Sequence, residues 1–264
     1  MYPTKYTKAA SIDDAVATLA TGEDAKLLAG GQTLLATMKQ HLAAPSDVID
    51  IRAIDGMAGV STDGNALVIG AATTHADVAG NADVQRLCPA LASLAGGIGD
   101  PAVRYAGTIG GSIANNDPAA DYPAGLLALG ATVVTNRREI TADDFFDGLF
   151  TTALDVDEII TSVRVDAPKR AAYVKFRQPA SLFALVGVCV ADGAGSTRVA
   201  VTGAGEDGVF RHAGLEAALS ANWSAAAADG VSVDSDGLMS DMHGSADYRA
   251  NLIKVLTKRA VDAS

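Results

Sequence analysis

The chain has 264 residues, of which 49% are hydrophobic, so a substantial core can form without disulfides or metals. The net charge of −11 argues against a nucleic-acid partner, because phosphate binding relies on clustered Lys and Arg. Cys88 and Cys189 form no C-x-x-C pair, which excludes an iron–sulfur or zinc cluster of the chain's own. The sequence starts without a signal-like apolar stretch and no apolar run reaches about 18 residues, so we expect a cytoplasmic protein without a membrane span.

The first elements alternate strands with helices. Ser11, with Asp14 three residues on, resembles a capping box that opens a helix through Leu19. A strand at 25–29, a Gly-Gly turn, a helix at 32–41 and a strand at 48–51 follow. This order indicates a βαβ unit whose glycine turn lies at the carboxyl end of its first strand.

The remaining elements fall into two groups. Before residue 168 we expect strands at 66–72, 131–135 and 158–165, helices at 73–78, 83–95 and 122–129, and a loop at 99–116. After Pro168 we expect strands at 172–177, 183–191 and 197–202, then helices at 211–220 and 247–261. Strands followed by helices favour an α+β unit with an antiparallel sheet. The predicted domains are 1–168, with subdomains of about 1–56 and 57–168, and 169–264.

The first glycine segment, residues 27–35, reads LLAGGQTLL. A strand that ends in Gly-Gly and runs into a helix presents unpaired backbone N–H groups, which can hold an anion. Thr33 adds a hydroxyl group, and no Lys or Arg lies within the segment. The G-x-G-x-x-G spacing of a Rossmann fold is missing, and a tight turn without a ligand is the alternative.

The second glycine segment, residues 107–121, reads GTIGGSIANNDPAAD. Its hydroxyls, amides and glycines suit a polar ligand better than a packed core, and successive N–H groups around glycines can form an anion nest. Asp121 either caps the following helix or accepts a hydrogen bond from a sugar hydroxyl. An ordinary loop is the alternative, but two such segments without basic residues favour one large ligand of dinucleotide size.

The paired segments resemble the FAD-binding subunits of the molybdenum hydroxylases, above all the medium subunit of aerobic carbon monoxide dehydrogenase. The chain is similar, more distantly, to the flavin domain of xanthine dehydrogenase. The resemblance covers nearly the whole chain, including the runs VRYAGTIGG and YVKFRQPASLFALVGV. It implies an α+β chain with the FAD-binding fold of the p-cresol methylhydroxylase type, built from two α/β subdomains and followed by a small α+β C-terminal domain with an antiparallel sheet.

The resemblance also implies FAD as the cofactor, with candidate binding residues assigned by matching position. Those near the pyrophosphate are Leu27, Leu28, Ala29, Gly30, Gly31, Gln32, Thr33 and Leu34 on one side, and Thr108, Ile109, Gly110, Gly111, Ser112 and Asn115 on the other. Ile98 and Ile160 match apolar positions beside the flavin or adenine, and Asp121 matches an acid at the ribityl or ribose. Arg177 falls where a basic residue reaches the cofactor from the second domain, with Lys175 as a rival. Phe183 either covers a ring face or belongs to the core.

The resemblance further implies a heteromeric oxidoreductase complex. A large subunit would carry the molybdenum cofactor and the substrate, and a small subunit two [2Fe–2S] centres. Electrons would then pass through FAD to an external acceptor such as a quinone, NAD or oxygen. We expect no catalytic side chain or metal ligand in this chain, because its four histidines are scattered. The substrate stays open among carbon monoxide, a purine, an aldehyde and an N-heterocycle.

Two alternative functions are a flavin-free scaffold of the same fold and a nicotinamide-dependent dehydrogenase. The latter would use GAGEDG at 203–208, a literal G-x-G-x-x-G after a predicted strand. Glu206 and Asp207 would repel a pyrophosphate there. A hairpin or a strand-to-helix turn is therefore the preferred interpretation of this segment.

Overall fold

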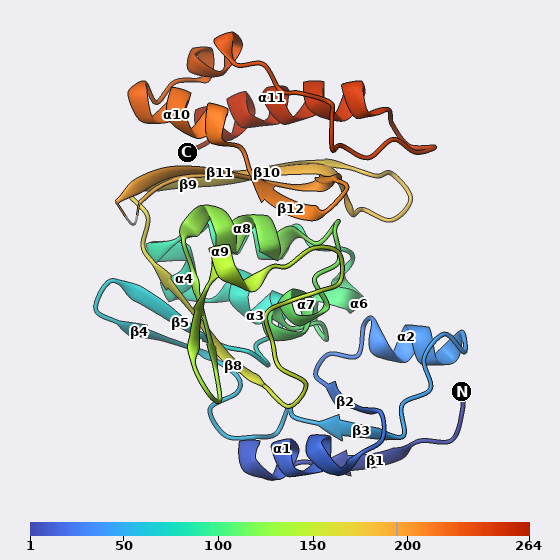
Figure 1. The fold of residues 1–264 in the computed structure, drawn as a ribbon. Helices are drawn as coiled ribbons and strands as arrows, with labels where there is room; N and C mark the ends of the chain where they lie inside the picture. The colour runs from blue at the N-terminus through green and yellow to red at the C-terminus, as the bar shows by residue number, and fades with distance from the viewer. Residues whose placement is uncertain (194) are drawn as a thin grey trace.

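The computed structural model describes residues 1–193 and 195–264 and contains three β-sheets that follow one another through the molecule (Figure 1). The strands are β1 (Lys5–Lys8), β2 (Ala25–Leu28), β3 (Asp47–Asp50), β4 (Val60–Asp63), β5 (Ala66–Gly70), β6 (Thr132–Thr135), β7 (Glu139–Thr141), β8 (Ile160–Asp166), β9 (Arg170–Arg177), β10 (Ala184–Gly193), β11 (Ser196–Gly205) and β12 (Gly208–Arg211). The helices are α1 (Ile12–Thr21), α2 (Leu34–Lys39), α3 (His75–Gly80), α4 (Ala82–Leu87), α5 (Pro89–Gly96), α6 (Pro101–Arg104), α7 (Ile109–Asn115), α8 (Asp121–Leu129), α9 (Ala142–Phe145), α10 (Ala213–Ala221) and α11 (Ala246–Asp262), with a 3₁₀ helix at Ala225–Gly230.

The N-terminal sheet is parallel, in the order β1-β3-β2. The predicted βαβ unit is confirmed, and β2, which leads into the first glycine segment, is an edge strand. Its two helices cover opposite faces: Ile49 packs with Ala15 of α1, while Val48 packs with Met38 of α2. Ser11 caps α1 as predicted, its Oγ accepting the Asp14 N–H at 3.1 Å.

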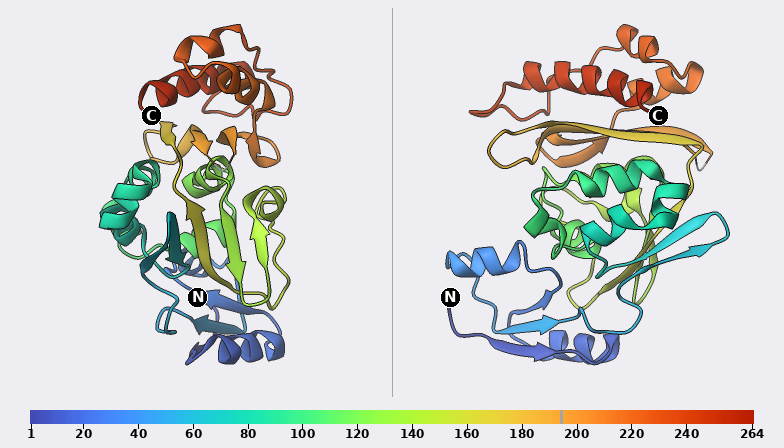
Figure 2. Two further views of the ribbon diagram at one scale, coloured as in Figure 1. Left: turned by 90° about the vertical axis from the view of Figure 1, so that its left-hand side faces the viewer. Right: turned by 180° about the vertical axis from the view of Figure 1, so that it is seen from behind.

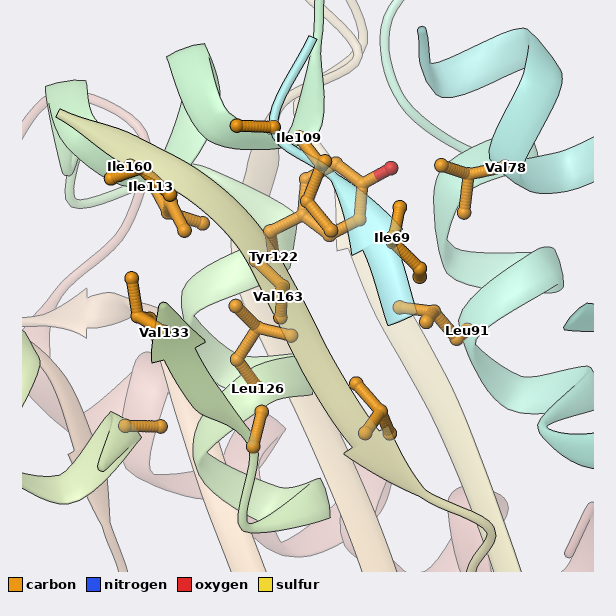
Figure 3. Close-up of a cluster of buried hydrophobic side chains, with 14 of the residues drawn as sticks. Ile69, Val78, Leu91, Ile109, Ile113, Tyr122, Leu126, Val133, Ile160 and Val163 are labelled. Atoms are coloured by element: carbon orange, nitrogen blue, oxygen red, sulfur yellow. The ribbon is translucent and has the colours of Figure 1, made fainter. Parts of the chain in front are cut away.

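The middle sheet, in the order β4-β5-β8-β6-β7, pairs antiparallel throughout. Its core is centred on α8, in which every residue from Asp121 to Leu129 is buried. Figure 3 shows Tyr122 and Leu126 of this helix among aliphatic side chains from β5, β6, β8 and α7. The helix is therefore enclosed by the sheet and its neighbouring helices, which explains its continuous apolar sequence.

The C-terminal sheet is antiparallel, in the order β12-β11-β10-β9, and lies between α8 on one face and α10 and α11 on the other (Figures 1 and 2). Its two central strands, β10 and β11, are mostly buried on both faces: Cys189 joins the core around α8, while Val188 joins the core beneath α11. The Thr202 hydroxyl donates to the Ala120 carbonyl at 2.7 Å, and the Gly203 N–H donates to the Pro118 carbonyl at 2.8 Å. These hydrogen bonds connect the C-terminal sheet to the residues just before α8.

Several local predictions need correction. The single helix expected at 83–95 is two, since Pro89 lacks the N–H that a continuous helix requires and begins α5 instead. The loop expected at 99–116 contains α6 and α7. By contrast, the preferred hairpin at 203–208 is confirmed, as β11 turns there into β12. The predicted domain limits, about 56 and 168, fall in connections between sheets. Among the described residues, no helix is long and apolar enough to cross a bilayer.

Candidate functional site

The two glycine segments are in direct contact although they are distant in sequence. A methyl group at Gly30 would lie 2.1 Å from the Ala106 carbonyl oxygen and 2.5 Å from Gly107 Cα, so the two main chains touch. A methyl group at Gly111 would lie 3.7 Å from Ala29 Cβ. The segments therefore form one surface, and only glycine at position 30 permits this approach.

The first glycine segment presents a row of free main-chain donors. Among the described residues, none accepts a hydrogen bond from the N–H groups of Ala29 to Leu34. Gly31 adopts a φ of +69°, which turns the chain between β2 and α2. Thr33 precedes α2 without a side-chain cap, so its hydroxyl stays available. This is the arrangement of an anion site built from amides and a hydroxyl group.

The second glycine segment is different, and the expected nest of exposed amides is wrong. The N–H of Ile109 donates to the Thr73 carbonyl at 3.1 Å, and that of Gly110 to the Ala71 carbonyl at 2.8 Å. The next two N–H groups donate to Thr108, at its Oγ1 and its carbonyl oxygen. Two causes combine. Thr108 is the N-cap of α7 and accepts from Gly111 and Ser112, while carbonyl groups distant in sequence accept from Ile109 and Gly110.

The second segment offers polar side chains, rather than backbone amides, to a ligand. The hydroxyl of Ser112 and the carboxamide of Asn115 make no hydrogen bond with any described residue, and both residues are half-buried. Gly111 lies beside them, exposed, and faces Ala29. Amide donors on one segment therefore meet polar side chains on the other.

Asp121 does not cap α8 with its side chain, because the N-cap is Ala120 and Asp121 is the first helical residue. Its carboxylate is 4% exposed and accepts hydrogen bonds from Lys175 Nζ, at 2.9 Å, and from the Tyr173 hydroxyl. Burial raises the pKa of Asp121, and Lys175 and Tyr173 act in the opposite direction. The carboxylate that we expect to accept a hydrogen bond from a sugar hydroxyl is thus already engaged within the chain, and its role at the sugar remains a prediction.

Lys175 and Arg177 occupy the same face of β9, because alternate residues of a strand point to one side. The Lys175 side chain is 5% exposed and fully committed to Asp121. Arg177 is exposed, makes no ion pair with the described residues, and places Nη2 3.7 Å from the Cβ position of Gly97. Of the two rivals, Arg177 is therefore the cation left free beside the half-buried Ile98.

Several other predicted residues lie inside the core. Ile109 and Ile160 pack with Ile113 beneath the second glycine segment, and Figure 3 shows Ile160 and Ile113 side by side. Leu28 is also buried, on the α2 face of the N-terminal sheet. These side chains support the surface from below. Phe183, in contrast, is 48% exposed, which contradicts the core interpretation.

Sequence reasoning missed three polar residues near the site: His75 and Tyr122, which are buried, and Tyr173, which is partly buried. Tyr173 could have been found, because it shares a strand face with Lys175 and Arg177 in AAYVKFR. His75 is only 4% exposed, and its place among four scattered histidines gave no sign of this burial. No group of three or more potential metal ligands occurs in the part of the chain that the structure describes.

Free backbone donors at a sheet edge, next to a second polar segment, are typical of nucleotide-binding proteins of mixed α and β structure. Comparison with known proteins gives the family. A family model described as the FAD binding domain in molybdopterin dehydrogenase matches residues 2–168, and the chain belongs to this family. FAD is accordingly its cofactor.

Similar proteins match this chain over nearly its full length. The chain is 35% identical to the nicotine 6-hydroxylase medium subunit of Paenarthrobacter nicotinovorans, over 97% of this chain and 95% of that protein. It is 36% identical to the carbon monoxide dehydrogenase medium chain of Hydrogenophaga pseudoflava, over 96% and 94%. A solved carbon monoxide dehydrogenase from H. pseudoflava, which lacks the Mo-pyranopterin moiety of the molybdenum cofactor, superposes with a TM-score of 0.90 and 36% identity, over 100% of this chain and 98% of that one. The expected fold and the resemblance are confirmed, and the chain is a subunit of the oxidoreductase class.

Proposed function

We propose that this chain carries FAD as one subunit of a molybdenum hydroxylase. It receives electrons from [2Fe–2S] centres on a small partner subunit and passes them to an external acceptor. The molybdenum cofactor and the substrate-oxidising site would lie on a large partner. Support comes from the family match and from relatives that are named medium subunits or chains.

The observation that carries the proposal is the row of unengaged N–H groups from Ala29 to Leu34. A pyrophosphate needs several donors, and the net charge of −11 opposes any anion that lacks them. Backbone amides supply partial positive charge in fixed positions and need no reorganisation when the ligand arrives. The residues of the structure therefore fit FAD at its most strongly charged part.

When bound, FAD supplies the redox chemistry, while this chain supplies binding and orientation. We assign the pyrophosphate to the amides of Ala29–Leu34 and the Thr33 hydroxyl. Ser112 and Asn115 would donate to the same ligand from the second segment. Arg177 would reach it from β9, beside Ile98.

The direct test is purification of the full chain followed by a visible absorption spectrum and a titration of the flavin-stripped protein with FAD. We expect a flavin spectrum and saturable binding with one FAD per chain. A colourless protein that takes up no added FAD would instead favour the flavin-free scaffold. A parallel titration with NAD should show no saturable binding at 203–208, since those residues form a hairpin.

Gly111→Asp is expected to weaken FAD binding by about 100-fold. The Cβ position at Gly111 meets only Thr108 Oγ1, at 3.0 Å, and Ala29 Cβ, so a side chain fits with a small shift. The added carboxylate would then face the segment assigned to the phosphates. Gly111→Asn is the neutral control of the same shape, and equal FAD affinities for the two variants would overturn the assignment.

Arg177→Met is expected to raise the FAD dissociation constant about tenfold, because one charge-assisted contact is lost. Arg177→Lys should retain part of the affinity, and the effect should shrink as salt is added. Arg86→Met serves as the control, since Arg86 is an exposed cation that pairs with Asp83. If Arg177→Met bound FAD like the control, another group would have to supply the cation.

The partners and the compartment are part of the proposal. A large and a small subunit should co-purify with the chain when all three are expressed together. A quinone, NAD or oxygen would be the acceptor, and each can be tested with the assembled complex. We place the chain in the cytoplasm, a reducing compartment that suits its two unpaired, buried thiols. Burial raises the pKa of the Cys88 thiol to about 11, so it stays protonated and unreactive.

A further inference from the structure

Two buried polar atoms without partners lie close together behind the second glycine segment. They are Nδ1 of His75 and the hydroxyl of Tyr122, and neither forms a hydrogen bond with any described residue. The two side chains are 4% and 0% exposed, and their ring centroids are 5.3 Å apart. In Figure 3 the Tyr122 hydroxyl points towards Val78, which lies one helical turn after His75 on α3.

His75 is in direct contact with the second glycine segment. Its backbone N–H donates to the Gly107 carbonyl at 3.0 Å. A methyl group at Gly107 would lie 2.7 Å from His75 Nε2, so the imidazole ring rests against the Gly107 main chain. Gly30 also touches Gly107, since its Cβ position lies 2.5 Å from Gly107 Cα. Successive contacts therefore connect His75 through Gly107 to Gly30, which belongs to the row of free amides.

We propose that one buried water molecule bridges His75 Nδ1 and the Tyr122 hydroxyl, and that this bridge makes His75 a positioning residue for the FAD-binding amides. The positioning role rests on the proposed function. The water bridge does not, because it concerns only two side chains and a water molecule.

The chemistry of the two groups is complementary. Burial, together with the nearby charge of Arg104, lowers the pKa of His75 to about 4, so the ring is neutral near pH 7. Burial also raises the pKa of Tyr122, which keeps its hydroxyl protonated. With the imidazole proton on Nε2, Nδ1 accepts a hydrogen bond from the water molecule. The Tyr122 hydroxyl donates to the same water molecule.

An unsatisfied buried donor or acceptor is costly, and buried water usually serves such pairs. The bridge would also fix the rotation of the His75 ring. Since the ring supports Gly107, its rotation sets how closely Gly107 approaches Gly30. A loosened ring would therefore disturb the donors that FAD needs, at a distance from the ligand.

A matched set of variants tests the bridge. Asn and Leu have the same shape, and both keep an atom where His75 Cδ2 faces Gly107, 3.1 Å from its Cβ position. Only Asn also places an acceptor, its Oδ1, where Nδ1 of His75 stands. We would measure the FAD dissociation constant and the melting temperature of the flavin-free full chain for His75→Asn and His75→Leu, each with and without Tyr122→Phe. A crystal structure of the wild-type chain would be examined for the water molecule.

We expect Tyr122→Phe to weaken FAD binding about tenfold in the wild type and in the His75→Asn variant. In the His75→Leu variant the same change should weaken FAD binding less than about twofold, because residue 75 then has no acceptor that could lose its hydrogen-bond partner. Electron density for a water molecule within hydrogen-bonding distance of both atoms is expected.

Equal effects of Tyr122→Phe in the Asn and Leu variants would overturn the positioning role. Absence of the water molecule from a well-ordered crystal would overturn the bridge, and this readout also decides the matter if the Leu variants do not fold. A wild-type chain that contains the water but binds no FAD would refute the proposed function and the positioning role while leaving the bridge intact.

Discussion

Gly30→Ala is expected to raise the FAD dissociation constant by about 100-fold or more while the chain still folds. The new methyl group would lie 2.1 Å from the Ala106 carbonyl oxygen, a main-chain atom that cannot rotate away. The two glycine segments would have to separate by about 1 Å, because carbon and oxygen atoms need roughly 3.2 Å between them. The amides of Ala29–Leu34 would then no longer face the polar side chains of the second segment. FAD fluorescence quenching and thermal unfolding of the flavin-free chain measure the two effects separately.

Gly80→Ala is the matched control for this change. Gly80 is the last residue of α3, and a methyl group there meets no atom within 4 Å. Alanine should be neutral or slightly stabilising at that position, since it favours helix more than glycine does. Wild-type FAD affinity in Gly30→Ala would show that the contact between the segments is irrelevant to the cofactor.

The elements and the first site segment could be predicted because their causes are local. A Gly-Gly turn between an apolar strand and a helix leaves the first N–H groups of the helix without a partner inside the helix, and those of Ala29–Leu34 are free among the described residues. The break at Pro89 has an equally local cause, since proline begins helices more readily than it continues them, but the single helix predicted at 83–95 overlooked it. Local patterns were sufficient for these features.

The second segment could not be predicted correctly because its partners are distant. The amides of Ile109 and Gly110 donate to Thr73 and Ala71, which follow β5. No pattern within 107–121 reveals that these carbonyls arrive there. The same holds for Asp121, whose carboxylate meets Lys175 only because α8 packs on the sheet to which β9 belongs. Polar residues that suit a ligand suit an internal partner equally well, and packing decides between the two.

The pair of Asp121 and Lys175 leads to the last large effect. Lys175→Met is expected to destabilise the chain by about 3–5 kcal/mol, because it leaves a buried carboxylate without its cation. Denaturant unfolding with an unchanged m-value would measure the loss. Lys258→Met is the control: Lys258 pairs with Asp229 at the surface, and its removal should cost less than about 1 kcal/mol. Equal stabilities of the two variants would contradict the role of the buried pair.

The double variant Asp121→Asn with Lys175→Met should recover most of the loss, since a neutral amide needs no cation and can still accept the Tyr173 hydroxyl. The single variant should also respond to pH in a defined direction. Lys175 lowers the pKa of Asp121 against the effect of burial, so its removal raises that pKa further above the unfolded value. The folded state then binds a proton that the unfolded state releases, and its stability falls as pH rises through this window. Lys175→Met should therefore lose more stability at about pH 8 than at about pH 5, whereas the double variant, which has no carboxyl group at 121, should lack this dependence.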